Sequence, residues 1–212
     1  MDLFTHITPT KISILPDVVL LKGFALGDAE VLFADLQAVI NLAPLRHMMT
    51  KMGFSMSAAM TNCGDLGWVS DRKGYRYDAL DPLTNQPWPK MPASFQQLAN
   101  LAASEAGFNN FQPDACLINQ YKVGASMGLH QDKNEVDYSQ PIVSVSLGIA
   151  AVFLFGGELR SDKPIKIPLA HGDVIVWGGK TRQNFHGIMP LKADTHSTLG
   201  AYRYNLTFRK AG

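Results

Sequence analysis

Apolar side chains recur at helical spacing in two stretches of the first half of the chain. The first stretch follows Gly27-Asp28, a pair suited to starting a helix, and ends before Pro44. Its apolar stripe consists of Val31, Leu32, Leu36, Val39 and Ile40. A second helix is predicted to begin near Pro92 and to stop at Gly107, with Phe95, Leu98, Leu101 and Ala102 on one face.

From Ala115 onward the pattern changes to alternation with a period of two, interrupted by Gly, Pro and Asp. Short strands are predicted at 115–122, 127–132, 142–147, 150–155, 173–178, 183–187 and 201–209. Strands at this spacing, without helices between them, indicate an antiparallel sandwich or a jelly roll. The sequence therefore predicts an α+β, mainly β protein, in which a helical and irregular first half packs against a β-rich second half.

Composition narrows the class of protein. The 212 residues are 46% hydrophobic and 17% charged, which fits one globular domain with a sizeable core. The net charge of +1 excludes a strongly cationic binder that relies on counterion release, so any nucleic-acid contact needs a local patch. Two cysteines, Cys63 and Cys116, are too few for a disulfide scaffold and are expected to be free thiols. Without a secretory signal or an apolar run of about 20 residues, we expect a cytoplasmic protein that spans no membrane.

The segment from Leu45 to Tyr77 carries a local positive charge. It holds five basic and two acidic residues, and it ends in the basic-aromatic run Arg72-Lys73-Gly74-Tyr75-Arg76-Tyr77. Charge asymmetry of this kind is typical of a surface for an anionic partner. A solvated loop with some exposed aromatic residues would look the same, so the charge alone leaves both interpretations open.

A candidate metal site begins with His130-Gln131-Asp132. Residues two apart on a strand point to the same face, about 6.6 Å from each other, so an imidazole and a carboxylate can converge on one ion. Of the candidates His171, His186 and His196, the best third ligand is His186, because residues 183–187 are typical of a short strand ending in Gly. Two histidines and one carboxylate form the facial triad of non-haem Fe(II), although the ligand types also allow a catalytic zinc.

The last predicted strand carries a second set of polar residues. One face consists of Arg203, Asn205, Thr207 and Arg209. Because a guanidinium matches a carboxylate bidentately, the two arginines suit a molecule with a carboxylate at each end. Asn119 and Tyr121, which share a face of the strand at 115–122, are expected to complete this pocket.

These motifs resemble those of the AlkB family of alkylated-DNA repair dioxygenases, which bind iron and 2-oxoglutarate. The similarity extends over nearly the whole chain and is weakest in the first 25 residues. It includes His130-Gln131-Asp132, Phe185-His186-Gly187, the run from Arg203 to Arg209, Met60-Thr61-Asn62-Cys63-Gly64, Leu66-Gly67-Trp68, and the segments 111–119, 142–148 and 173–179.

The resemblance implies a double-stranded β-helix (jelly roll) with N-terminal helices and a nucleotide-recognition lid. The implied divisions are an N-terminal extension with a helix at 1–44, the lid at 45–90, and a helix plus the jelly-roll core at 91–212, within one structural domain. Fe(II) would be held by His130, Asp132 and His186. The co-substrate 2-oxoglutarate would be held by Arg203 with Tyr121, Asn119, Asn205 and Thr207, and Arg209 would lie near its iron-chelating carboxylate.

The resemblance also implies the reaction and the substrate. With O2, the enzyme would demethylate bases such as 1-methyladenine and 3-methylcytosine in DNA, releasing formaldehyde, succinate and CO2. The implied substrate-binding residues are Met60, Trp68, Tyr75, Arg76, Tyr77, Asn134 and Arg160, with the base between Trp68 and His130. The expected partner is alkylated single-stranded DNA, with double-stranded DNA and RNA as further substrates, and a monomer is expected.

One position departs from the family pattern, and two other functions compete with DNA demethylation. The family has an acidic residue two positions after the iron-binding Asp, where this chain has Asn134. Loss of that charge is expected to weaken the preference for cationic lesions. An oxygenase of the same fold could act on RNA or protein instead. A β-sandwich binding module without enzymatic activity would use His130 and Asp132 only to close a turn.

Overall fold

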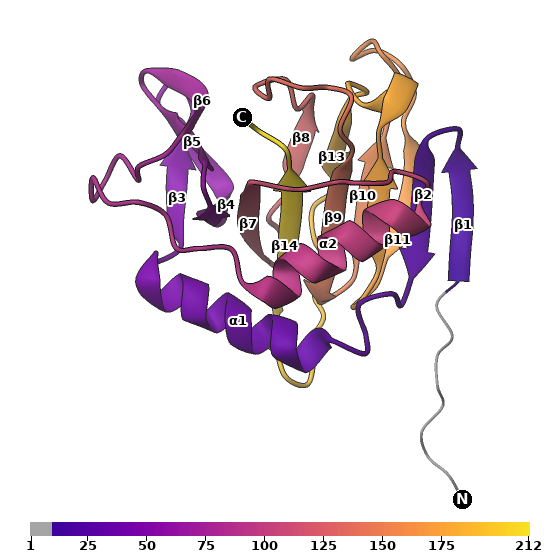
Figure 1. Ribbon diagram of the computed structural model, residues 1–212, viewed down its shortest axis with the longest axis horizontal. Helices are drawn as coiled ribbons and strands as arrows, with labels where there is room; N and C mark the ends of the chain where they lie inside the picture. Colours follow the sequence, from indigo (N-terminus) through magenta and orange to yellow (C-terminus); the bar gives the residue numbers. More distant parts are fainter. Residues whose placement is uncertain (1–9) are drawn as a thin grey trace, which may run out of the picture.

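Three antiparallel sheets and two helices make up the protein in a computed structural model that describes residues 10–212 (Figure 1). The largest sheet has eight strands in the order β1-β2-β12-β9-β14-β7-β4-β3. Their bounds are β1 Thr10–Leu15, β2 Val18–Lys22, β12 Val174–Trp177, β9 Ile142–Gly148, β14 Tyr202–Arg209, β7 Ala115–Lys122, β4 Ser55–Gly64 and β3 Arg46–Met49.

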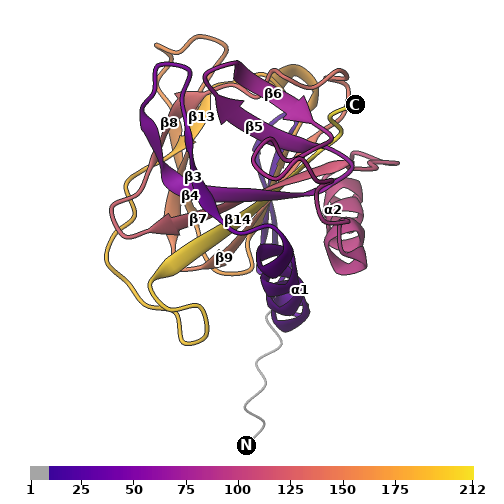
Figure 2. The same cartoon turned by 90° about the vertical axis from the view of Figure 1, so that its left-hand side faces the viewer.

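A four-stranded sheet and a separate hairpin complete the β structure. The four-stranded sheet has the order β11-β10-β13-β8, with β11 Ile165–Leu169, β10 Ala151–Phe155, β13 His186–Ile188 and β8 Met127–His130. The hairpin consists of β5 (Gly67–Asp71) and β6 (Gly74–Asp78), which pair only with each other in the described part of the chain. Figure 2 shows this hairpin at the top of the molecule, beside β3 and β4.

Each face of the eight-stranded sheet buries its own apolar core. On one face, α1 (Ala29–Leu42) and α2 (Ala93–Glu105) cover Val174 and Val176 of β12, together with Leu206 of β14. On the other face, Ile175 and Trp177 of β12 pack with Phe153 of β10, between the two sheets. Successive side chains of a strand point to opposite faces, so β12 serves both cores. Two facing antiparallel sheets form the predicted jelly roll, and the fold class is confirmed.

Strand β14 places its polar face between the sheets rather than in solvent. Tyr204 and Phe208 belong to the core beneath the helices, whereas Arg203, Asn205 and Arg209 point the other way and are buried. Burial of polar side chains is costly unless they find partners. We therefore expect a bound molecule to contact this face of β14.

The predicted helices and most predicted strands lie where the sequence places them, with some corrections. In α1 and α2, Val31 and Leu101 are exposed because they lie at the edges of the apolar stripes. Asp28 precedes α1 but its side chain makes no capping hydrogen bond. The sequence analysis missed β1, β2, β3, β4, β5, β6 and β11.

The segment expected to be an N-terminal extension contributes to the main sheet. Strand β2 pairs with β12, and its four residues from Val18 to Leu21 are buried. A strand covered on both faces is apolar throughout and lacks the alternation that reveals a half-buried strand. Residues 1–9 of the predicted extension lie outside the described residues. Within the segment 45–90, β3 and β4 also belong to the main sheet.

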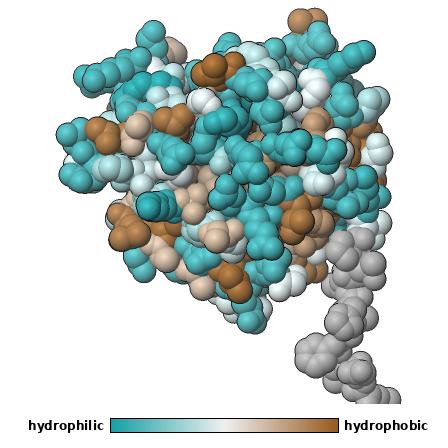
Figure 3. All heavy atoms as spheres, in the orientation of Figure 1, coloured by the Kyte–Doolittle hydropathy of each residue, from teal (hydrophilic) through white to brown (hydrophobic). Residues whose placement is uncertain are grey.

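Apolar residues on the face shown in Figure 3 lie in several separate places among hydrophilic ones. Among residues 10–212, no helix is long and apolar enough to cross a bilayer.

Candidate active site

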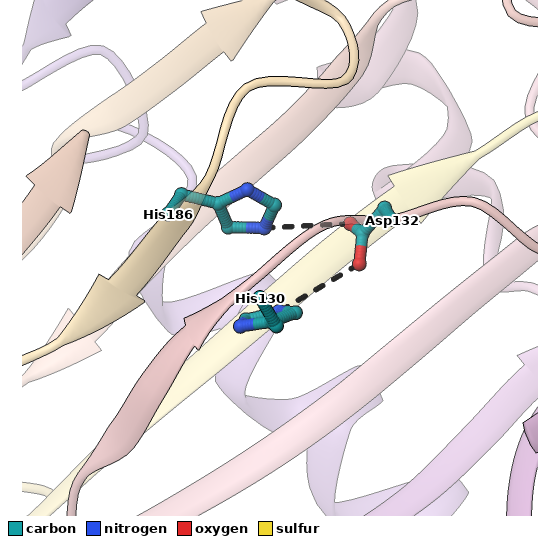
Figure 4. A group of neighbouring side chains, drawn as sticks. All are labelled: His130, Asp132 and His186. Carbon is teal, nitrogen blue, oxygen red and sulfur yellow. Dashed lines mark ion pairs between the residues drawn. The ribbon is translucent and has the colours of Figure 1, made fainter. Parts of the chain in front are cut away.

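Two histidines from neighbouring strands of the four-stranded sheet converge with an aspartate from the segment that follows one of these strands (Figure 4). His130 ends β8 and lies directly across from His186 of β13 in the strand register. Asp132 follows β8, and its carboxylate oxygens lie 3.7 Å from Nε2 of His130 and 3.6 Å from Nε2 of His186. One ligand atom from each residue lies within 4.8 Å of the others, so the group could hold a metal ion.

Both imidazoles are oriented by backbone carbonyl groups. Nδ1 of His130 lies 3.0 Å from the carbonyl oxygen of Gly128, and Nδ1 of His186 lies 3.0 Å from that of Asn184. Each Nδ1–H can donate to its carbonyl, which leaves Nε2 facing Asp132. Burial, reinforced by His186, lowers the pKa of His130 to about 4. His130 is therefore neutral near pH 7, the form that ligates a metal.

The carboxylate of Asp132 is held by an arginine from β14. Oδ2 of Asp132 accepts hydrogen bonds from Nη2 and Nε of Arg209, at 2.6 Å and 2.9 Å. Burial opposes ionisation of Asp132, but Arg209 acting together with His186 and His130 outweighs burial, and the pKa of Asp132 lies well below its usual range. The carboxylate is thus ionised and available to a cation. The sequence suggests that Arg209 binds the second carboxylate of a diacid. In the structure its guanidinium instead contacts Asp132.

A buried arginine with unused donors lies on the same face of β14. Nη2 of Arg203 donates to Oγ of Ser146 at 3.0 Å, and the guanidinium lies 5.2 Å from the ring centroid of Tyr121. Its Nε and Nη1 atoms have no hydrogen-bond partner within the described part of the chain, and neither does Oδ1 of Asn119. Buried donors normally find acceptors, so this spot suits a carboxylate supplied from outside the chain.

Neighbouring polar residues are fixed by strand pairing. Arg203 lies opposite Tyr121, and Asn205 lies opposite Asn119, in the β14–β7 register. The amide of Asn205 donates to Oγ of Ser144 at 2.7 Å, and its oxygen accepts from Thr207 at 2.9 Å. The wall of the pocket is therefore rigid before anything binds.

A single cavity of about 610 Å³ joins these groups. Its lining includes the whole metal-ligand set and all six residues expected to hold 2-oxoglutarate. Of the residues expected to bind substrate, Met60, Trp68, Tyr75, Asn134 and Arg160 line it as well. Trp68 and Tyr75 stack on each other, with ring centroids 5.7 Å apart and an interplanar angle of 12°.

Two residues expected to contact substrate lie elsewhere. Arg76 pairs with Asp71 and Asp78 of its own hairpin, so its charge is already balanced. The hydroxyl of Tyr77 donates to Oε1 of Glu135 at 2.7 Å. Neither residue lines the cavity.

The sequence analysis missed several residues that shape the site. Ser144 and Ser146 alternate with Val143, Val145 and Leu147 in β9, a period-two signal that could have revealed them. Glu135 and Arg182 are buried beside Asp132 and lie outside the strands. No sequence pattern marks these two residues, because only the folded chain brings them close to Asp132.

Comparison with known proteins agrees with this geometry. The family described as the 2OG-Fe(II) oxygenase superfamily matches residues 17–209. The chain belongs to this superfamily. The α-ketoglutarate-dependent dioxygenase AlkB of Escherichia coli is 52% identical over 212 residues, which cover 100% of this chain and 98% of that protein. This dioxygenase is thus of the bacterial AlkB type.

Two further matches extend the comparison. The DNA N(6)-methyladenine demethylase ALKBH1C of Arabidopsis thaliana is 34% identical over 171 residues, covering 68% of this chain and 38% of that protein. The solved structure of OsALKBH1 superimposes with a TM-score of 0.81 at 28% identity, covering 95% of this chain and 100% of that one.

The dioxygenase uses Fe(II), 2-oxoglutarate and O2. The residues present fit these groups. Two imidazole nitrogens and one carboxylate oxygen are the donor set of non-haem iron, and the part of the chain that lines the cavity within residues 10–212 offers no cysteine of the kind that binds structural zinc. The unpaired donors of Arg203 fit one end of a diacid.

Proposed function

We propose that this dioxygenase is a DNA-repair enzyme that oxidatively demethylates N-alkylated bases of the 1-methyladenine and 3-methylcytosine type in DNA. Formaldehyde, succinate and CO2 would be the products. The observation that carries the proposal is the composition of one cavity. It is lined by the metal-ligand set, by Arg203, whose Nε and Nη1 have no partner within residues 10–212, and by the stacked pair of Trp68 and Tyr75.

His130, Asp132 and His186 would hold the iron. When bound, iron and 2-oxoglutarate supply, together with O2, the oxidant for a methyl C–H bond that acid–base catalysis cannot break. The residues of the protein hold the metal-ligating groups in position. Carbonyl groups orient the two imidazoles, and Arg209 keeps Asp132 ionised. These contacts come from the chain itself and hold the metal-ligating groups in place, which reduces the reorganisation that binding requires.

Arg203 would bind the carboxylate of 2-oxoglutarate that lies away from the metal. Its guanidinium has two unused donor nitrogens, and Tyr121 and Asn119 lie across the strand pair from β14. A charge-assisted, bidentate contact would satisfy these donors and offset the cost of burying the charge.

The methylated base would enter beside Trp68, Tyr75, Asn134 and Arg160, with Met60 deeper in the cavity. Aromatic stacking contributes about 1–3 kcal/mol per base and tolerates any sequence, which suits an enzyme that must find rare lesions. The base must leave the duplex to reach such a cavity, and unpairing costs less for a damaged base or a single strand. We therefore propose single-stranded DNA as the preferred substrate.

The proposal is tested by measuring formaldehyde released from methylated single-stranded DNA, double-stranded DNA, RNA and peptide. Single-stranded DNA carrying 1-methyladenine or 3-methylcytosine is expected to give the fastest release. Asp132→Asn should lower it at least about 100-fold, because a metal ligand is lost. The matched control, Asp194→Asn, changes an exposed carboxylate away from the cavity and should leave the rate unchanged. Release from RNA or peptide alone would overturn the proposed substrate.

We also propose that the enzyme acts as a monomer, because every residue of the candidate site comes from one chain. Light scattering of the active protein measures its mass directly. A mass corresponding to one chain is expected, and a stable dimer would contradict this.

A further inference from the structure

A buried ionic cluster lies behind the cavity wall and is not explained by ligand binding alone. Its members are Tyr77, Asp132, Glu135, Arg182 and Arg209. The side chains of Glu135 and Arg182 are 1% and 2% exposed. Glu135 does not line the cavity, although its neighbour Asn134 does.

Glu135 is shared by three partners from distant parts of the chain. Its Oε1 accepts from the hydroxyl of Tyr77 at 2.7 Å and lies 3.5 Å from Nε of Arg209. Its Oε2 lies 3.3 Å from Nη2 of Arg182. Burial raises the pKa of Tyr77, so the phenol stays protonated and can donate.

The same two arginines contact Asp132, one at its side chain and the other at its main chain. Arg209 contacts the carboxylate, and Nη1 of Arg182 donates to the main-chain oxygen of Asp132 at 3.1 Å. Two carboxylates therefore balance two guanidinium groups in a space with little water. Removal of one charge from such a group leaves another unpaired, which is costly in a buried site. Because Glu135 also attracts Arg209, its charge weakens the electrostatic attraction between Arg209 and Asp132.

We propose that Glu135 is a positioning residue that sets the orientation of the Asp132 carboxylate and the electrostatic potential around it through Arg209 and Arg182, and that anchors the substrate-side hairpin β5–β6 to the same point through Tyr77. Without Glu135, two cations would face Asp132 alone. The local potential would become more positive, and a divalent cation would bind more weakly. This inference rests on the proposed metal site.

The first test measures binding of Co(II), without nucleic acid, by its visible absorption spectrum. Glu135→Gln keeps the shape and an acceptor for Tyr77 but removes the charge. Its Kd for Co(II) should rise about 10–100-fold, with a changed spectrum, because a residue that supports a metal ligand is lost. The matched control, Glu30→Gln, alters an exposed side chain on α1 and should bind Co(II) like the wild type.

Two outcomes would overturn this half of the proposal. If Glu135 only maintains stability, Glu135→Gln lowers Tm while the Co(II) Kd and spectrum stay those of the wild type. If Glu135 contacts the base, the variant raises KM for the methylated oligonucleotide and again leaves Co(II) binding unchanged. Failure of the proposed DNA substrate is distinguishable, because Co(II) binding is measured without DNA.

Tyr77→Phe tests the second half and is expected to fold, since only a hydroxyl is removed. The variant should raise KM for methylated single-stranded DNA several-fold, with kcat and the Co(II) Kd unchanged, because the hairpin loses one anchor. An unchanged KM would overturn the anchoring role.

Discussion

Arg203 shows, at the scale of one residue, the cost of burying a charge that the described part of the chain only partly satisfies. Its guanidinium is 1% exposed and makes one hydrogen bond, to Ser146. Burial lowers its pKa, which reflects the cost of keeping this charge away from water. A diacid would therefore stabilise the protein mainly through Arg203.

Arg203→Met is predicted to abolish stabilisation by 2-oxoglutarate. With Mn(II) present and the diacid at about 100 times its Kd, wild-type stability should rise by about 2.7 kcal/mol. Tm should then rise by about 5–10 °C for a chain of this length. The variant should show no rise, and its Tm without ligand should not fall, because an underpaired buried charge has been removed. Thermal unfolding measures both, with Arg72→Met as the exposed control. A rise equal to that of the wild type would contradict this role for Arg203.

Asn134 sits at the boundary between the hairpin and the cavity. Its Oδ1 lies 3.4 Å from Nε1 of Trp68, and its Nδ2 lies 3.5 Å from the carbonyl oxygen of Tyr75. Both are long hydrogen bonds, so the amide can turn toward a base without great loss.

Asn134→Asp is predicted to favour cationic lesions over neutral ones. A carboxylate about 4 Å from a cationic base contributes about 1 kcal/mol in a well-solvated site, or about fivefold in relative rate. Competition between 3-methylcytosine, which is cationic, and a neutral N-alkylated base in one oligonucleotide pool measures this ratio. An unchanged ratio would show that residue 134 does not set the charge preference.

At the scale of elements, alternation explains what could be predicted from the sequence. Strands β7 and β14 were predicted within a residue of their observed bounds because each buries two different faces. The same alternation put Asn119, Tyr121, Arg203 and Asn205 on one face of the sheet, where they line the pocket. Strand β2 shows no alternation, because Val18 to Leu21 are all apolar and buried. Glu135 and Arg182 were missed because only the folded chain brings residues 77, 135, 182 and 209 together.

The turn entering β12 contains His171, which lies beside His196 of the loop before β14. His171 and His196 have ring centroids 4.3 Å apart, and Nδ1 of His171 accepts from the backbone N–H of Gly148 at 3.0 Å. Burial, reinforced by His196, lowers the pKa of His171. The unfolded chain therefore binds this proton at higher pH than the folded one. The contribution of His171 to stability is complete above about pH 6.5 and is lost as pH falls through the folded pKa.

His171→Gln is predicted to reduce the fall in Tm between pH 7.5 and pH 5.5. Glutamine can still accept from Gly148 but takes up no proton in this range. Because other groups titrate in both proteins, the difference between variant and wild type isolates His171. His47→Gln, at an exposed position, is the control. An equal fall in Tm for His171→Gln and the wild type would show that His171 contributes no pH dependence.

At the scale of the whole molecule, the site lies where the two sheets face each other. The apolar core on the helix side holds the eight-stranded sheet rigid, and the opposite face of the same sheet carries Asn119, Arg203 and Asn205. The four-stranded sheet supplies His130 and His186 from across the gap. The two sheets must therefore pack correctly before the site exists, and this relation was available from the sequence only through the family resemblance.

Side-chain hydrogen bonds from several parts of the chain join the hairpin β5–β6 to this framework. Asn62 of β4 bonds the backbone N–H and carbonyl of Trp68 at 3.0 Å each, and Tyr77 bonds Glu135. A module attached in this way can diverge or be exchanged between related enzymes while the oxidising centre is inherited intact. Changes at the exposed and half-buried positions of the hairpin can then alter which lesions are accepted, without changes to the residues that carry out the chemistry.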